Sequence, residues 1–179
     1  SIGFKQGDVL ALIGDNKPEW VFFEIACHAN GGMSLGVYRD TLDDEVGYLV
    51  KSAKVKFAYA EDQEQVDKLI NVQKKLKTKI KVIYDDPRGL EKLKNPNVIN
   101  MKDLASVGKK QLDKNNKLYE NLINKISGET VSVLCTTSGT TSNPKLAMLP
   151  ANKFINHISN YLKVDPKSHL DEYLSLIHI

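Results

Sequence analysis

The sequence has little of several residue types that would mark a special class of protein. Among its 25 basic residues only Arg39 and Arg88 are arginines, and Cys27 and Cys135 are its only cysteines. The cysteines stand far apart, with no Cys-x-x-Cys pair and no histidine at ligand spacing, which argues against a disulfide framework or a zinc site. No run of about 18 apolar residues is available to cross a membrane. We therefore predict two buried thiols and a reducing, cytoplasmic location.

The size and composition are those of a folded domain. The chain has 179 residues, of which 41% are hydrophobic and 26% are charged, so a disordered or collagen-like chain is excluded. This length allows one α/β domain with a substantial core. The chain opens on Ser1 rather than on methionine. We therefore expect it to be a piece of a longer protein.

The charge is unevenly distributed along the chain. Residues 1–50 carry three basic and eight acidic groups, whereas residues 51–125 carry 18 basic and 10 acidic groups. A Lys-rich nucleic-acid-binding module built on residues 51–125 is therefore one alternative. The shortage of arginine and the acidic residues interleaved with the lysines favour solvated helix faces instead, so we expect no nucleic-acid partner.

The pattern of apolar residues predicts strands that alternate with helices. Short apolar runs predict strands at 8–14, 33–38, 55–60, 80–84, 130–136 and 146–149. Helices are predicted from Pro18 to the Gly31-Gly32 pair, after caps at Thr41 and Asp62, over 102–126 and over 152–162, with 88–100 irregular. This alternation predicts an α/β fold with a mostly parallel, doubly wound sheet flanked by helices.

Some residues with chemical potential fit structural roles better than catalytic ones. A lone histidine on a helix is usually packed or capping, and aromatic residues at helical spacing usually belong to the core. We expect packing for His28, His157, Trp20, Phe22 and Phe23, and a solvated turn at Asp85-Asp86.

The most informative stretch is the loop Thr137-Ser-Gly-Thr-Thr-Ser-Asn-Pro-Lys145, directly after a predicted buried strand. Its hydroxyls, backbone N–H groups and lysine are suited to binding phosphate oxygens. The loop lacks the Gly-Lys-Ser/Thr ending of a Walker loop, and no Gly-x-Ser-x-Gly elbow is present. On composition alone, a polar surface loop fits equally well.

The same nine residues resemble the AMP-binding signature of the adenylate-forming superfamily, although Ser142 stands where that signature usually has glycine. Upstream, Gly7–Trp20, Gly36–Tyr38, Tyr59–Lys68 and Val82–Asp85 resemble the long-chain fatty acid–CoA ligase (acyl-CoA synthetase) branch. The resemblance covers most of residues 1–173. It implies an incomplete N-terminal AMP-binding domain over 1–173.

The resemblance implies an AMP-forming ligase that uses ATP, Mg²⁺ and CoA to activate a fatty acid. It implies phosphate-binding roles for Thr137, Ser138, Gly139, Thr140, Thr141, Ser142 and Lys145. A ligase for another carboxylic acid stays an alternative, and so does peripheral membrane association of the full-length protein. The family's catalytic lysine belongs to a C-terminal domain outside this chain, so we expect the 179 residues alone to be inactive.

The last six residues, Leu174–Ile179, do not continue the family pattern. One reverse translation of them matches a sequencing adapter, and we hypothesise that this tail is adapter read-through. Alternating leucine and isoleucine would also suit a genuine strand. The underlying codons decide between the two readings.

Overall fold

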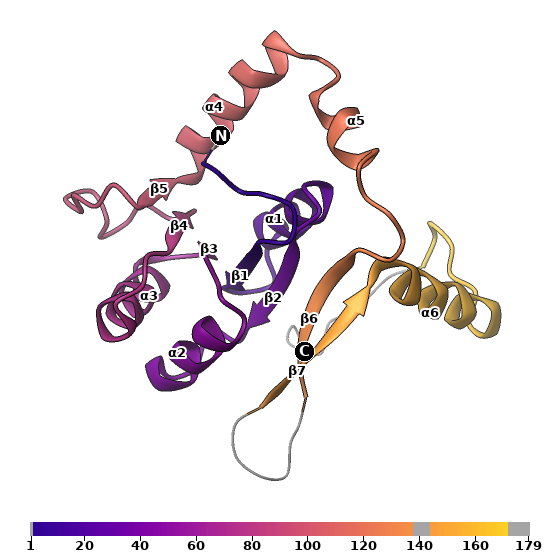
Figure 1. The fold of residues 1–179 in the computed structure, drawn as a ribbon, viewed down its shortest axis with the longest axis horizontal. Helices are drawn as coiled ribbons and strands as arrows, with labels where there is room; N and C mark the ends of the chain where they lie inside the picture. The colour runs from indigo at the N-terminus through magenta and orange to yellow at the C-terminus, as the bar shows by residue number, and fades with distance from the viewer. Residues whose placement is uncertain (1, 138–143, 172–179) are drawn as a thin grey trace.

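The computed structural model describes residues 2–137 and 144–171, and its centre is one seven-stranded sheet (Figure 1). The strands lie in the order β5-β4-β3-β1-β2-β6-β7, and every neighbouring pair is parallel except the antiparallel pair β6–β7. The strands are β1 (Val9–Ile13), β2 (Met33–Val37), β3 (Phe57–Ala60), β4 (Lys81–Tyr84), β5 (Val98–Asn100), β6 (Val131–Thr137) and β7 (Lys145–Pro150). The predicted mostly parallel sheet is confirmed.

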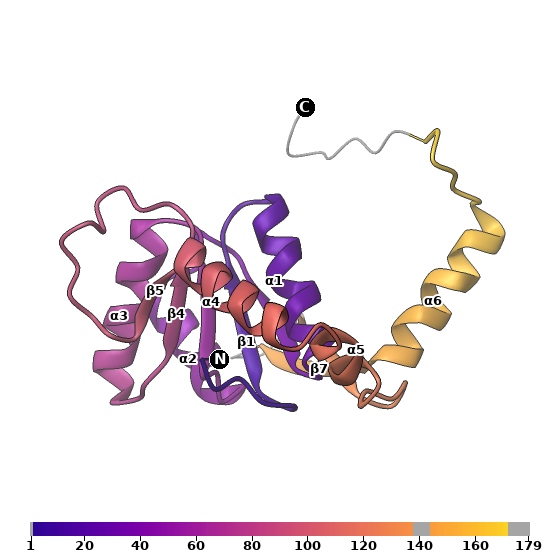
Figure 2. The ribbon, with the colours of Figure 1, turned by 90° about the horizontal axis from the view of Figure 1, so that it is seen from above.

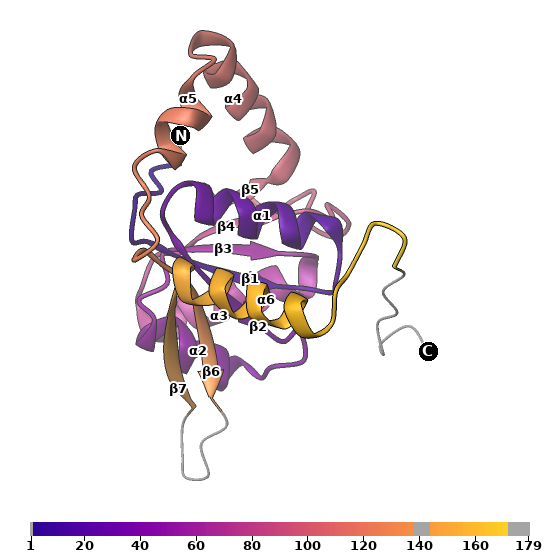
Figure 3. The same ribbon diagram turned by 90° about the vertical axis from the view of Figure 1, so that its right-hand side faces the viewer.

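Helices cover both faces of this sheet, as the doubly wound prediction requires (Figure 3). The helices are α1 (Pro18–Ala29), α2 (Asp43–Ser52), α3 (Gln63–Leu76), α4 (Met101–Lys114), α5 (Leu118–Ile123) and α6 (Ala151–Val164). Helices α2 and α3 pack on one face and α1 on the other. Figure 2 shows α6 beyond the β7 edge, at the opposite end of the molecule from α3. No helix in the described ranges is long and apolar enough to span a membrane.

The alternation of side chains along β1 explains the two hydrophobic clusters. All five residues of β1 are buried, because this strand is central and is covered on both faces. Val9, Ala11 and Ile13 join the cluster with α2 and α3, whereas Leu10 and Leu12 join the cluster with α1. The central strands therefore form a rigid platform for the loops at their ends.

Local sequence signals set several of the helix ends. Pro18 occupies the first turn of α1, where its missing N–H costs nothing. The same helix ends in a Schellman motif, because Gly31 N–H bonds to His28 O and Gly32 N–H bonds to Cys27 O. Asp62 caps α3 as predicted by accepting a hydrogen bond of 3.1 Å from Gln65 N–H.

Three boundary predictions were wrong. Leu42, not Thr41, is the N-cap of α2, and no side chain caps this helix. Part of the segment predicted to be irregular forms β5, which extends the sheet beside β4. The helix predicted over 102–126 is split into α4 and α5, because Asn115 ends α4 and its side chain accepts a hydrogen bond from Lys117 N–H.

Candidate functional site

The candidate site lies where β6 ends and β7 begins. Thr137 is the last residue of β6, Lys145 is the first of β7, and the two face each other as a cross-strand pair. The Thr137 hydroxyl donates a hydrogen bond of 3.4 Å to the Lys145 carbonyl oxygen. The fold therefore joins the first and last residues of the predicted phosphate loop. The other predicted loop residues, Ser138, Gly139, Thr140, Thr141 and Ser142, lie outside the described ranges.

The hairpin of β6 and β7 projects beyond the rest of the sheet (Figure 1). The register of β6 with β2 covers only Val133 and Leu134, and the exposed residues 135–137 pair with β7 instead. Since β6 runs parallel to β2, its end lies at the carboxyl edge of the sheet, where open α/β sheets bind ligands. Thr137 and Lys145 are both exposed there. Their side chains are therefore accessible to a ligand.

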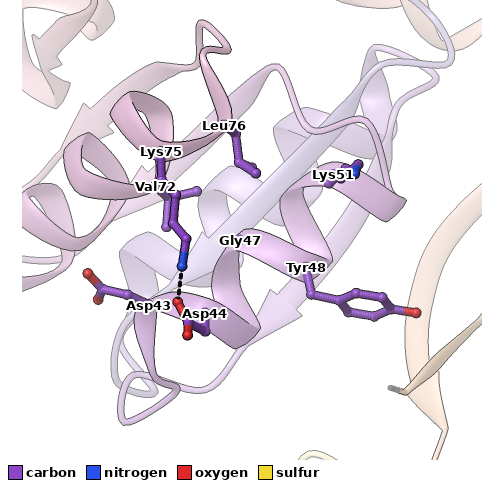
Figure 4. A pocket seen from close by; sticks show the side chains of 8 residues that line it. All are labelled: Asp43, Asp44, Gly47, Tyr48, Lys51, Val72, Lys75 and Leu76. Carbon is purple, nitrogen blue, oxygen red and sulfur yellow. Dashed lines mark hydrogen bonds and ion pairs between the residues drawn. The ribbon is translucent and has the colours of Figure 1, made fainter. Parts of the chain in front are cut away.

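A residue that the sequence analysis missed contacts this hairpin from α2. The Tyr48 hydroxyl donates a hydrogen bond of 3.1 Å to the carbonyl oxygen of Pro144, next to Lys145. Figure 4 shows the Tyr48 ring pointing away from α3, whereas Asp44 pairs with Lys75 on the side of α2 that faces α3. No short-range pattern predicts this contact, because 96 positions separate the two residues.

Charged side chains link the ends of β1, β2 and β3 at the same edge of the sheet. Arg39, after β2, pairs with Asp15 at 2.5 Å and with Asp62 at 3.3 Å. Glu61, after β3, accepts a hydrogen bond of 2.6 Å from Asp15 N–H and pairs with Lys17. These bonds fix the loops that follow the three central strands.

The buried carboxylate of Glu61 is held in its charged form. Burial by itself would raise the pKa of Glu61, but the Asp15 N–H and the Lys17 ammonium outweigh it and hold the pKa below its ordinary value. Asp85 behaves in the opposite way, because burial and the nearby Glu19 raise its pKa. In the described part of the chain, no group of three or more His, Cys, Asp or Glu side chains could hold a metal ion.

The two cysteines have different environments, and one prediction was wrong. Cys27 is buried as predicted, and burial raises the pKa of its thiol to about 12. Cys135 is exposed, because it lies on β6 beyond the part of the strand that pairs with β2.

The aromatic and histidine predictions were partly right. Phe23 stacks on Tyr59 with ring centroids 4.7 Å apart, and Trp20 packs in the same cluster, but Phe22 is 60% exposed. His28 lies within hydrogen-bonding distance of the Ser34 hydroxyl, whereas His157 is exposed on α6. Asp86 pairs with Arg88 in the turn after β4.

The lysines of residues 51–125 are in part neutralised by acidic side chains. Lys75 pairs with Asp44 at 2.5 Å, and Lys56 pairs with Asp8 at 2.7 Å. This arrangement agrees with the interpretation of the lysines as interleaved charges on solvated surfaces.

The chain is thus a doubly wound α/β domain, and a threonine and a lysine lie at the mouth of a loop on its carboxyl edge, where open α/β sheets bind ligands. The sequence model of the family described as "AMP-binding enzyme" matches residues 1–179, and the chain belongs to this adenylate-forming family.

Curated and solved relatives agree with this assignment. The chain is 30% identical to long-chain-fatty-acid–CoA ligase 5 of Rattus norvegicus over 194 residues, which cover 99% of this chain and 27% of the relative. It thus spans about a quarter of that protein's length. The fold is similar to the luciferase-like enzyme of the mealworm Zophobas morio, with a TM-score of 0.66 and 13% identity over 89% of this chain and 34% of that one.

An enzyme for a different acid has the same fold. The anthranilate CoA ligase AuaEII, solved in complex with anthranoyl-AMP, gives a TM-score of 0.60 and 14% identity over 84% of this chain and 26% of that one. At this identity the likeness concerns the fold alone. The structures of this family therefore do not by themselves select one carboxylic acid for this chain.

Proposed function

We propose that the chain is part of an AMP-forming long-chain fatty acid–CoA ligase. In the first step, a fatty-acid carboxylate oxygen bonds to the α-phosphorus of ATP, and the bond from that phosphorus to the β-bridging oxygen breaks. Pyrophosphate leaves with the electron pair. In the second step, the CoA thiolate attacks the acyl carbon of the acyl-adenylate, and AMP leaves.

The observation that carries this proposal is the position of the loop signature. The nine residues from Thr137 to Lys145 start and end at the mouth of a hairpin on the carboxyl edge of the sheet. The choice of a fatty acid is supported by the 30% identity to a long-chain-fatty-acid–CoA ligase along almost the whole chain.

The described residues of the site have roles that suit this chemistry. Phosphoryl-group reactions depend mainly on positioning and on neutralising charge at the phosphate oxygens. The exposed ammonium of Lys145 supplies a positive charge at the loop mouth. The Thr137 hydroxyl holds the Lys145 backbone from the opposite strand. Mg²⁺ would enter with the nucleotide as part of the substrate.

The test uses the full-length enzyme that contains this chain, assayed for fatty-acid-dependent exchange of pyrophosphate into ATP. Lys145→Ala should lower exchange by about tenfold or more, because a charge-assisted phosphate contact is lost. Lys109→Ala on the exposed surface of α4 is the matched control and should leave exchange unchanged. Exchange that Lys145→Ala does not reduce would refute the proposed role of the loop.

A ligase for another carboxylic acid is the second candidate, and the similar fold of the anthranilate CoA ligase favours it. The same exchange assay separates the two candidates when fatty, aryl and amino acids are compared. Exchange that depends on aryl or amino acids, and that fatty acids do not support, would replace the long-chain assignment.

A further inference from the structure

We infer that Tyr48 is a positioning residue for ATP, because its hydroxyl fixes the backbone from which Lys145 projects. The inference rests on the proposed function, since it assigns to α2 a role in the phosphate site. Tyr48 lies 96 positions before Pro144, and its hydroxyl donates a hydrogen bond of 3.1 Å to the Pro144 carbonyl oxygen.

The bond acts on the peptide unit that joins Pro144 to Lys145. The Pro144 carbonyl belongs to the same planar group as the Lys145 N–H, so a bond to its oxygen orients that plane. The proline ring already restricts φ of Pro144. On the other side of Lys145, the Thr137 hydroxyl donates to the Lys145 carbonyl oxygen at 3.4 Å. The Lys145 backbone is thus held from both sides.

The hairpin needs such a support because the sheet holds it only near its base. Its register with β2 stops at Leu134, where the Leu35 partner lies in the core. In the described ranges, two side-chain hydrogen bonds connect the hairpin to other elements. One runs from the Ser34 hydroxyl to Ser132 O near the base, and the other is the bond from Tyr48 near the tip.

Tyr48 can provide this support because α2 is firmly anchored. Val46, Leu49 and Val50 of α2 are buried in the core between the sheet and helices α2 and α3. Tyr48 packs against the same core. Lys75 of α3 pairs with Asp44 of α2 on the far side of a small pocket of about 150 Å³ (Figure 4). The hydroxyl is therefore presented to the hairpin from a rigid layer.

The test compares the full-length enzyme with its Tyr48→Phe variant, which loses only the hydroxyl. The affinity for ATP with Mg²⁺, measured by titration calorimetry, should fall about threefold to tenfold, the value of one hydrogen bond. The KM for the fatty acid should stay unchanged, and the melting temperature without ATP should fall only slightly, because the folded state loses one hydrogen bond. In hydrogen exchange, the amides of residues 145–147 should exchange faster in the variant.

Tyr119→Phe on the half-exposed surface of α5 is the matched control and should change none of these values. Equal ATP affinity in Tyr48→Phe and wild type would overturn the inference, and so would a loss of fatty-acid affinity as large as the loss of ATP affinity. Weaker ATP binding by Tyr48→Phe in an enzyme that shows no fatty-acid-dependent exchange would support the inference while refuting the proposed substrate. Absence of ATP binding by the wild type would overturn both.

Discussion

The carboxylate of Glu61 accepts a hydrogen bond of 2.6 Å from the backbone N–H of Asp15. This bond ties the loop after β3 to the loop after β1, and Lys17 pairs with the same carboxylate. Glu61 is 6% exposed, so its charge is compensated by protein groups more than by water. At the carboxyl edge of the sheet, a side-chain to backbone hydrogen bond therefore connects the loops that follow two adjacent central strands.

Removing this carboxylate should destabilise the domain. Glu61→Ala leaves the Asp15 N–H without its acceptor, and we expect a loss of about 2 kcal/mol in the free energy of unfolding of the full-length protein. Glu61→Gln keeps an acceptor oxygen and should cost less. Glu64→Ala is the exposed control and should change stability by less than about 0.5 kcal/mol. Urea denaturation measures all three, and an equal effect of Glu61→Ala and Glu64→Ala would contradict the prediction.

The stabilising effect of Glu61 should depend on pH. Because the folded state lowers its pKa below the unfolded value of about 4.5, the unfolded state binds the proton more readily at low pH. The contribution is therefore fully present above the unfolded pKa and is lost as the pH falls through the folded pKa. The stability difference between wild type and Glu61→Gln should be largest near neutrality and should decrease below about pH 4.5. If this stability difference instead grew as the pH fell, folding would raise the pKa of Glu61 rather than lower it.

The two carboxylate oxygens of Asp62 have separate roles that substitution can distinguish. One oxygen caps α3 by accepting from Gln65 N–H, and the other pairs with Arg39 at 3.3 Å. Asp62→Ala removes both interactions and should cost about 1 kcal/mol or slightly more. Asp62→Asn keeps a capping oxygen and should recover most of this loss. Thermal unfolding of both variants is the measurement, and equal losses would assign the effect to the ion pair rather than to the cap.

The sequence predicts the central part of this fold well, because strong local patterns coincide with the tertiary environment. The apolar run in β1 is buried on both faces, and the cap at Asp62 is a local signal that the structure confirms. Strand β5 was missed because it has only three half-buried residues. This strand is stabilised by its pairing with β4, and a local sequence pattern does not reveal such a pairing.

The candidate site was predictable to a smaller extent. The motif locates Thr137 and Lys145, whose pairing across the hairpin follows from a strand–loop–strand arrangement. Tyr48 could not be found this way, because its contact with Pro144 depends on how α2 packs against the sheet. The exposure of Cys135 also depends on tertiary pairing, since an apolar run does not reveal where the register with β2 stops.

Alanine substitutions at two glycines should change the stability of the protein in opposite directions. A Cβ on Gly14 would lie 2.8 Å from the Glu61 Cβ, and neither atom can move without a backbone shift. Gly14→Ala should therefore destabilise the full-length protein by about 1–3 kcal/mol. Gly108 lies inside α4 with no atom within 4 Å of a built Cβ, so Gly108→Ala should stabilise by about 0.5–1 kcal/mol through helix propensity.

Urea denaturation of the two alanine variants checks this contrast between close packing and free space. The double variant Gly14→Ala/Glu61→Gly adds a specific control, because it removes the Glu61 Cβ that crowds the new methyl group. Its loss of stability should be smaller than the sum of the two single losses, since the two residues are in direct contact. Strict additivity would show that the close approach of Gly14 to Glu61 does not determine the cost of the substitution.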